Sequence, residues 1–392
     1  MITRAFISIQ YGKTISMRPN EPMTPKERWL AAIRLQPVDR LPFWPKLNAS
    51  YPRAQAKPFR DMTIDALHDW MGSDKHIGIE GCLKENRQRT SVEISAISDT
   101  QRTIFRTPGG ELELIKRFDE TSQSWHPIRF PVKRVEDIEL MSDIFLDISL
   151  SVDKDALARA KKQSDAIGMD ALTANTIGKS ALMDWVEWLA GIETAHILLF
   201  DYREEVEALF EAIHQVLLKK TEILAENSVA DVLYLSENTS TTLISPAQYQ
   251  RYSQAHIQQY ATIARQRGKP LILHMCGHLK ALLRHLNSLP VEAFEAFTSP
   301  TMGDTTLLDG RVNCPQKCLI GGTNAVLWTR SSAEITAQIE RDLDSLPHHC
   351  GIVVTSAGVM PPLCQPETIK AVCEWVRRYP VRMDSASNNE PQ

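Results

Sequence analysis

The residues best suited to chemistry in this sequence lie in the segment Pro270–His278, which reads PLILHMCGH. Its apolar start is typical of a buried strand, and alternate side chains along a strand point to the same face. Ile272, His274 and Cys276 are therefore predicted to share one face. A neutral imidazole and a thiolate two positions apart suit zinc, which prefers nitrogen and sulfur ligands. The pair predicts part of a metal site, with a packed or hydrogen-bonded pair as the alternative.

Short apolar strands alternate with longer amphipathic helices around this segment. Helical patterns follow each of five strand segments in the second half of the chain, at 231–238, 270–277, 291–298, 318–324 and 351–358. Such alternation predicts parallel strands joined by right-handed crossovers. With LPFWPK (41–46), HIGIEG (76–81) and DALTANT (170–176) included, about eight units are present, which favours a single α/β (β/α)8 TIM barrel over an open sheet.

One part of the chain departs from this alternation. Between residues 85 and 133, apolar and polar residues alternate in short runs that are split by the turn sequence Thr107–Gly110. This pattern predicts an antiparallel β excursion inserted into the barrel. We expect a disordered leader at 1–23, with Met17 or Met23 as alternative starts, a barrel at 24–380 and a disordered tail at 381–392.

Composition narrows the classes of function. The chain has 392 residues and a formal net charge of −4 without a basic block, which argues against nucleic acid as a partner. No apolar run approaches the ~20 residues that span a bilayer, and no secretory signal is evident, so we expect no membrane association. Seven cysteines, an odd number spread along the chain, favour reduced thiols and a cytoplasmic location.

Polar residues at the predicted strand ends form the remaining candidates. Functional groups of a parallel barrel gather at the carboxyl ends of its strands. Glu237 and Glu295 end the strands on either side of the His274 strand, and we predict catalytic roles for both as proton carriers or as metal ligands. Asn238 and Asn324 are predicted to orient a substrate, with helix capping as the alternative.

Several segments together resemble the uroporphyrinogen decarboxylase superfamily. They read PKERWLAAI and PVDRLP between residues 25 and 42, LISP at 243–246, HMCG at 274–277, and PP followed by PETIK between 361 and 370. The resemblance extends over residues 24–380 and implies a (β/α)8 barrel, in agreement with the count of units.

The superfamily contains two chemistries, and the decarboxylases carry an arginine- and glycine-rich segment after the first strand. Here residues 44–55 read WPKLNASYPRAQ, in which Lys46 and Arg53 are available but do not reproduce that segment. Lys57 and Arg60 follow shortly after. A porphyrinogen with eight carboxylates would require several fixed cations, so this difference counts against porphyrinogen decarboxylation.

The second branch comprises cobamide-dependent methyltransferases, in which the His and Cys of H-x-C-G and a later Cys bind zinc. His274 and Cys276 match this motif, whereas Gly358 stands at the place of the later Cys. The resemblance then implies Cys364, six positions further on, as the third ligand, with Glu237 or Glu295 as alternatives.

The function implied by this branch is zinc-dependent transfer of a methyl group between a corrinoid and a thiol or tetrahydrofolate. The corrinoid is expected on a partner protein docked over the barrel mouth. Decarboxylation of uroporphyrinogen or a related carboxylate, without a metal, is the first alternative. A barrel that only holds a corrinoid or a metal, without catalysis, is the second.

Overall fold

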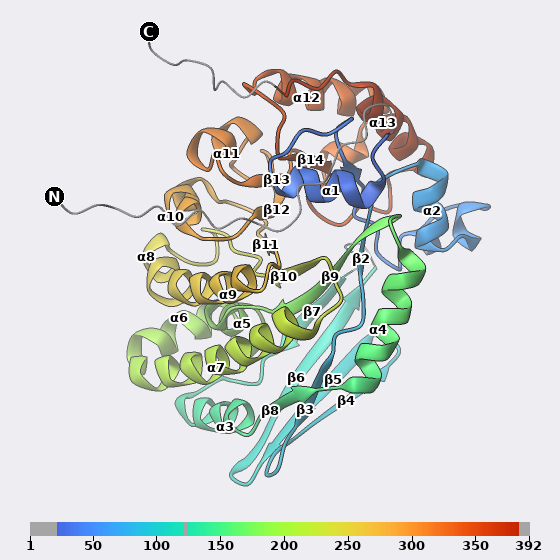
Figure 1. Ribbon diagram of the computed structural model, residues 1–392. Coiled ribbons are helices and arrows are strands. Elements are labelled where there is room, and N and C mark those ends of the chain that lie inside the picture. The colour runs from blue at the N-terminus through green and yellow to red at the C-terminus, as the bar shows by residue number, and fades with distance from the viewer. Residues whose placement is uncertain (1–21, 121, 123, 384–392) are drawn as a thin grey trace, which may run out of the picture.

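The computed structural model describes residues 22–120, 122 and 124–383. Eight parallel strands form one sheet in the order β1-β14-β13-β12-β11-β10-β9-β2. They are β1 (Phe43–Trp44), β2 (Lys75–Gly78), β9 (Ala171–Gly178), β10 (Val232–Ser236), β11 (Leu271–His274), β12 (Ala293–Phe297), β13 (Cys318–Gly321) and β14 (Ile352–Thr355). Helices surround these strands, so the predicted α/β barrel is confirmed (Figure 1).

The helices follow the predicted amphipathic segments. They are α1 (Pro25–Ile33), α2 (Ile64–Met71), α3 (Val135–Leu146), α4 (Lys154–Ile167), α5 (Ala181–Asp184), α6 (Ile192–Asp201), α7 (Arg203–Asn227), α8 (Pro246–Tyr249), α9 (Ala255–Gln266), α10 (Leu283–Ser288), α11 (Leu307–Asn313), α12 (Ser332–Asp344) and α13 (Pro366–Arg378). Thr24 and Glu27 form a capping box at the start of α1. After the HMCG segment the chain enters α10 through a 3₁₀ turn at Lys280–Leu282.

The apolar core is divided by the barrel wall. Ile272 belongs to a cluster inside the barrel with residues such as Val232, Ala293 and Ile320. Leu271, Leu273 and Met275 belong to the larger cluster that includes buried side chains of the surrounding helices. The alternation along β11 therefore places its odd-numbered residues toward the helices and its even-numbered residues inside.

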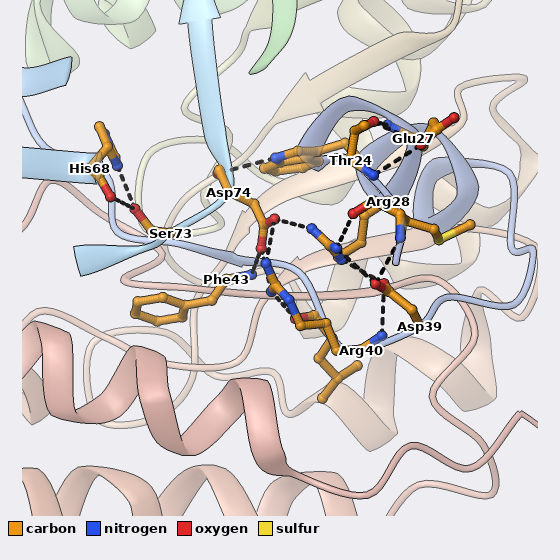
Figure 2. Close-up of polar contacts among 12 residues, drawn as sticks. Thr24, Glu27, Arg28, Asp39, Arg40, Phe43, His68, Ser73 and Asp74 are labelled. Carbon is orange, nitrogen blue, oxygen red and sulfur yellow. Dashed lines mark hydrogen bonds and ion pairs between the residues drawn. The ribbon is translucent and has the colours of Figure 1, made fainter. Parts of the chain in front are cut away.

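The barrel closes at a charged seam between β1 and β2. The backbone nitrogen of Asp74 donates to the carbonyl oxygen of Phe43 at 2.8 Å, and the Phe43 nitrogen donates to the Asp74 carboxylate at 3.0 Å. That carboxylate, which is fully buried, also accepts from the guanidinium groups of Arg28 and Arg40 (Figure 2). Asp39 holds Arg28 from its other side at 2.7 Å. The opening motifs PKERWLAAI and PVDRLP thus supply the contacts that join the ends of the sheet.

The antiparallel excursion is confirmed as two pieces outside the barrel. Strands β4 (Ser91–Ile97), β5 (Thr100–Thr107), β6 (Gly110–Asp119) and β7 (Ser124–Arg129) form one sheet in chain order. Strands β3 (Leu83–Asn86) and β8 (Ser149–Val152) pair separately. The four-stranded sheet projects from the barrel on the side of α3 and α4 (Figure 1).

The ends of the chain are described only in part. The predicted leader and tail lie outside the described residues, except for residues 22–23 and 381–383. Within the described ranges, none of the helices is both long and apolar enough to cross a membrane.

Candidate active site

A buried carboxylate organises the mouth of the barrel. Glu295, whose side chain is 1% exposed, pairs in register with His274 on the neighbouring strand. Its carboxylate contacts the Nδ1 atom of His274 and accepts a hydrogen bond from the hydroxyl group of Tyr234. The Nζ atom of Lys46 lies 3.2 Å from each of its two oxygens and 3.4 Å from His274 Nδ1. Four residues from four parts of the chain therefore meet inside the mouth.

Burial and the neighbouring charges together set the pKa values of the residues in this cluster. Burial would raise the pKa of Glu295, but Lys46 and His274 hold it well below its usual range. Burial and the Lys46 ammonium lower the pKa of His274, so the imidazole is neutral at pH 7. Because the contact to Glu295 is much closer than that to Lys46, Nδ1 carries the proton and donates it to the carboxylate. The Nε2 atom is then free of a proton and able to accept one.

The thiol of Cys276 belongs to a second set of contacts beside the first. It donates to the side-chain oxygen of Asn238 at 3.6 Å, and the Asn238 amide donates to Glu187 at 3.0 Å. Glu187 also forms an ion pair with Lys179. Burial, followed by the charge of Glu187, raises the pKa of Cys276 to about 11. Cys276 is therefore a neutral thiol at pH 7 in this arrangement.

Glu237 has a different environment from Glu295. Its fully buried side chain accepts from the Ser180 backbone nitrogen and, at 2.7 Å, from the Ser180 hydroxyl group. The Ser180 hydroxyl group also lies 3.4 Å from that of Ser253, in the π-helical turn Gln250–Gln254. Burial raises the pKa of Glu237 to about 7. This carboxyl group lies between the strand and the surrounding helices, so the structure does not bring it into the Glu295 cluster.

The other predicted residues are placed as follows. The Asn324 amide donates to Ser299 and Pro300, and its oxygen accepts from the Leu327 nitrogen. The buried Cys364 thiol contacts the Gln365 carbonyl oxygen at 3.8 Å. Asn324 and Cys364 therefore have local partners in the loops after their strands.

The predicted zinc ligands are not gathered into one site. Over residues 22–120, 122 and 124–383, no three His, Cys, Asp or Glu side chains are grouped so that they could hold a metal ion. Cys364 therefore does not complete a ligand set with His274 and Cys276. At Gly358, where the resembling family carries a cysteine, an added Cβ atom would have no neighbour within 4 Å. The donors as placed do not fit a three-ligand zinc site.

The backbone turns sharply after three of the mouth residues. Asn238, Ala296 and Ala357 directly follow Glu237, Glu295 and Ser356 and have φ angles of 52°, 61° and 62°. Residues with side chains seldom adopt this left-handed conformation, and such positions cluster at functional sites. These turns mark the carboxyl ends of β10, β12 and β14 as the functional end of the barrel.

Lys46 and Tyr234 are site residues that the sequence patterns do not single out. In the sequence Lys46 is one of several cations after the first strand, and Tyr234 lies inside a run typical of an apolar strand. Tyr234 and Ser236 lie on the same face of β10, and they pair in register with Ile272 and His274 on the inward face of the barrel. The sequence shows which residues of β10 share a face, but it does not show which face points inward.

One of two solved structures that resemble the chain supports this fold. A methyltransferase from Methanosarcina mazei is similar in structure with a TM-score of 0.57 and 14% sequence identity, over 91% of this chain and 98% of that one. A protein from Listeria monocytogenes, described as a vitamin-B12 independent methionine synthase, has a TM-score of 0.32 and 12% identity, over 61% of this chain and 68% of its own. Among curated proteins, none matches the chain in sequence.

A family match settles the relationship. The sequence model of the uroporphyrinogen decarboxylase (URO-D) family matches residues 128–379, which is more than half of the chain and includes β9 to β14 with the HMCG segment. The chain therefore belongs to the uroporphyrinogen decarboxylase family.

Proposed function

We propose that this protein transfers a methyl group between a corrinoid, carried by a partner protein, and a thiol or tetrahydrofolate acceptor. The observation that carries the proposal is the Lys46, Glu295 and His274 cluster at the mouth. An acceptor that enters as a thiol must lose a proton and become an anion. The cluster offers a neutral imidazole, held by a buried carboxylate, to take that proton, and an ammonium group to stabilise the negative sulfur.

The step balances in atoms and charge. The S–H bond of the acceptor breaks and its proton passes to His274 Nε2. The sulfur atom forms a bond to the methyl carbon, whose bond to the donor breaks with the electron pair remaining on the donor. Because the described donors do not fit the predicted zinc site, no part of this step passes through a metal.

One comparison supports the proposal. The whole-chain similarity to a protein described as a methyltransferase is consistent with the same reaction class.

Decarboxylation of uroporphyrinogen or a related carboxylate is the second candidate, and the family match favours it. The mouth lysines argue against a substrate with many carboxylates. Lys46 and Lys179 are each already paired, with Glu295 and Glu187 respectively. A small monocarboxylate would need only one of them.

The test is a parallel assay of both reactions. The purified protein is incubated with methylcobalamin and either 2-mercaptoethanol, homocysteine or tetrahydrofolate, and the methylated product is measured by mass spectrometry. A second set receives uroporphyrinogen, and loss of carboxyl groups is followed. A methylated acceptor supports the proposal, whereas a decarboxylated porphyrin means that the protein is a decarboxylase instead. Binding of methylcobalamin without any product favours a barrel that only binds.

A further inference from the structure

The ammonium group of Lys46 lies between Glu295 and His274, one of the two residues that match the zinc motif. It donates to the two oxygens of Glu295, each at 3.2 Å, and lies 3.4 Å from Nδ1 of His274, whose proton is directed to the same carboxylate. Oxygen and imidazole nitrogen are also zinc ligands, at roughly 2.0–2.2 Å from the ion. A zinc ion bound by these atoms would lie directly against a positive charge that the chain itself provides.

The position of Lys46 is fixed by the loops of the barrel mouth. Its backbone nitrogen donates to the Ser356 hydroxyl group at 3.1 Å, and its carbonyl oxygen accepts from the Met360 nitrogen at 2.9 Å. Its Nζ atom lies 5.8 Å from the centre of the Trp44 ring. The side chain is 23% exposed, so it is not sealed inside the protein.

The other predicted metal ligands are either missing or already paired with groups of the protein. Gly358 provides no side chain, and the Cys364 thiol lies against the Gln365 carbonyl oxygen. Tyr234 occupies one Glu295 oxygen, and Asn238 accepts from the Cys276 thiol. The donors that remain are thus saturated by the protein's own groups.

We propose that Lys46 is the permanent cation of this site and that it binds the anionic group of the substrate in the place where relatives of the zinc-dependent branch would hold a metal. The placement of this cation is independent of the proposed function. Only the identity of the anion, a substrate thiolate, rests on it. The protein would then act without zinc, through a charge that cannot be removed by chelation.

Metal content tests the placement directly. The wild type, Lys46→Ala and Lys46→Arg are equilibrated with zinc against a chromophoric chelator and analysed by elemental mass spectrometry. We expect no stoichiometric zinc in the wild type or in Lys46→Arg, and at least tenfold tighter zinc binding in Lys46→Ala, where Glu295 and His274 lose their contact with the ammonium group. Lys26→Ala, which removes a half-buried lysine paired with Asp231 at 3.1 Å, is the matched control and should bind no more zinc than the wild type.

Two results would overturn the proposal. One is a wild type that holds one zinc per chain and loses it in Cys276→Ala. The other is a folded Lys46→Ala protein, verified by circular dichroism, whose zinc affinity equals that of the wild type. If Lys46→Ala does not fold, Lys46→Gln takes its place, with the same expected gain in zinc affinity. If methyl transfer to a thiol is observed, the KM for the thiol should rise at least tenfold in Lys46→Ala and be largely restored in Lys46→Arg.

Discussion

The Lys46 ammonium group contacts both carboxylate oxygens of Glu295 at 3.2 Å, although 249 residues separate the two along the chain. One residue follows the first strand of the barrel and the other lies in β12, so closure of the sheet brings them together. The pair is the electrostatic centre of the mouth. It also accounts for how a carboxylate that is 1% exposed stays ionised.

Glu295→Gln should reduce the rate of methyl transfer strongly. The neutral amide can neither stabilise an imidazolium on His274 nor balance Lys46, and loss of a positioned acid–base group costs ~10²–10⁴-fold in rate. The measurement is kcat with methylcobalamin and a thiol. His274→Ala should show a loss of similar size, whereas the exposed Glu222→Gln should keep full activity. Unchanged kcat in Glu295→Gln would contradict the assigned role.

Glu237 should make stability depend on pH. Because burial raises its folded pKa to about 7, from 4.5, its contribution is fully present below pH 4.5 and is lost as the pH rises to about 7. The Gln variant resembles the protonated form, so Glu237→Gln should gain stability over the wild type as the pH rises from 4.5, by roughly 3 kcal/mol at pH 8. Urea unfolding at several pH values measures the difference. A difference in the free energy of unfolding that does not change with pH would disprove the role of Glu237.

Asp74→Asn should destabilise the barrel seam. The substitution removes the carboxylate that the buried Arg28 and the half-buried Arg40 share, leaving Arg28 only Asp39, and breaking a buried ion pair costs about 3–5 kcal/mol. Chemical denaturation gives the free energy of unfolding. Asp61→Asn, which removes an exposed pair with Lys57, should change it by less than about 1 kcal/mol. Equal effects of the two substitutions would mean that the seam contributes little.

The double variant Lys46→Ala/Gly358→Cys should bind zinc more tightly than Lys46→Ala alone. An added Cβ atom at Gly358 meets no neighbour within 4 Å, so a cysteine fits there and supplies the thiolate that the resembling branch carries. Competition with a chromophoric chelator measures the affinity. Gly358→Cys alone should remain a poor zinc binder, because Lys46 still holds the place of the ion.

Local patterns in the sequence are sufficient to predict the barrel and its excursion. Strand and helix periods appear along the chain, and a run such as PLILHMCG specifies which residues share a face. Hence Ile272 lies inside, while Leu271 and Leu273 lie outside. The turn at Thr107–Gly110 likewise specified a hairpin, which β5 and β6 form. These are local properties, so no long-range information was required.

Which residues at the barrel mouth contact one another depends on the tertiary fold. Glu237 follows the apolar residues of its strand segment and Glu295 lies between two apolar pairs of its own, but the register pairs Glu295 with His274 while Glu237 turns to Ser180. Because side chains alternate along a strand, a difference of one residue in register reverses the face. The meeting of Lys46 with Glu295 depends further on how the sheet closes, and no local pattern encodes that distance.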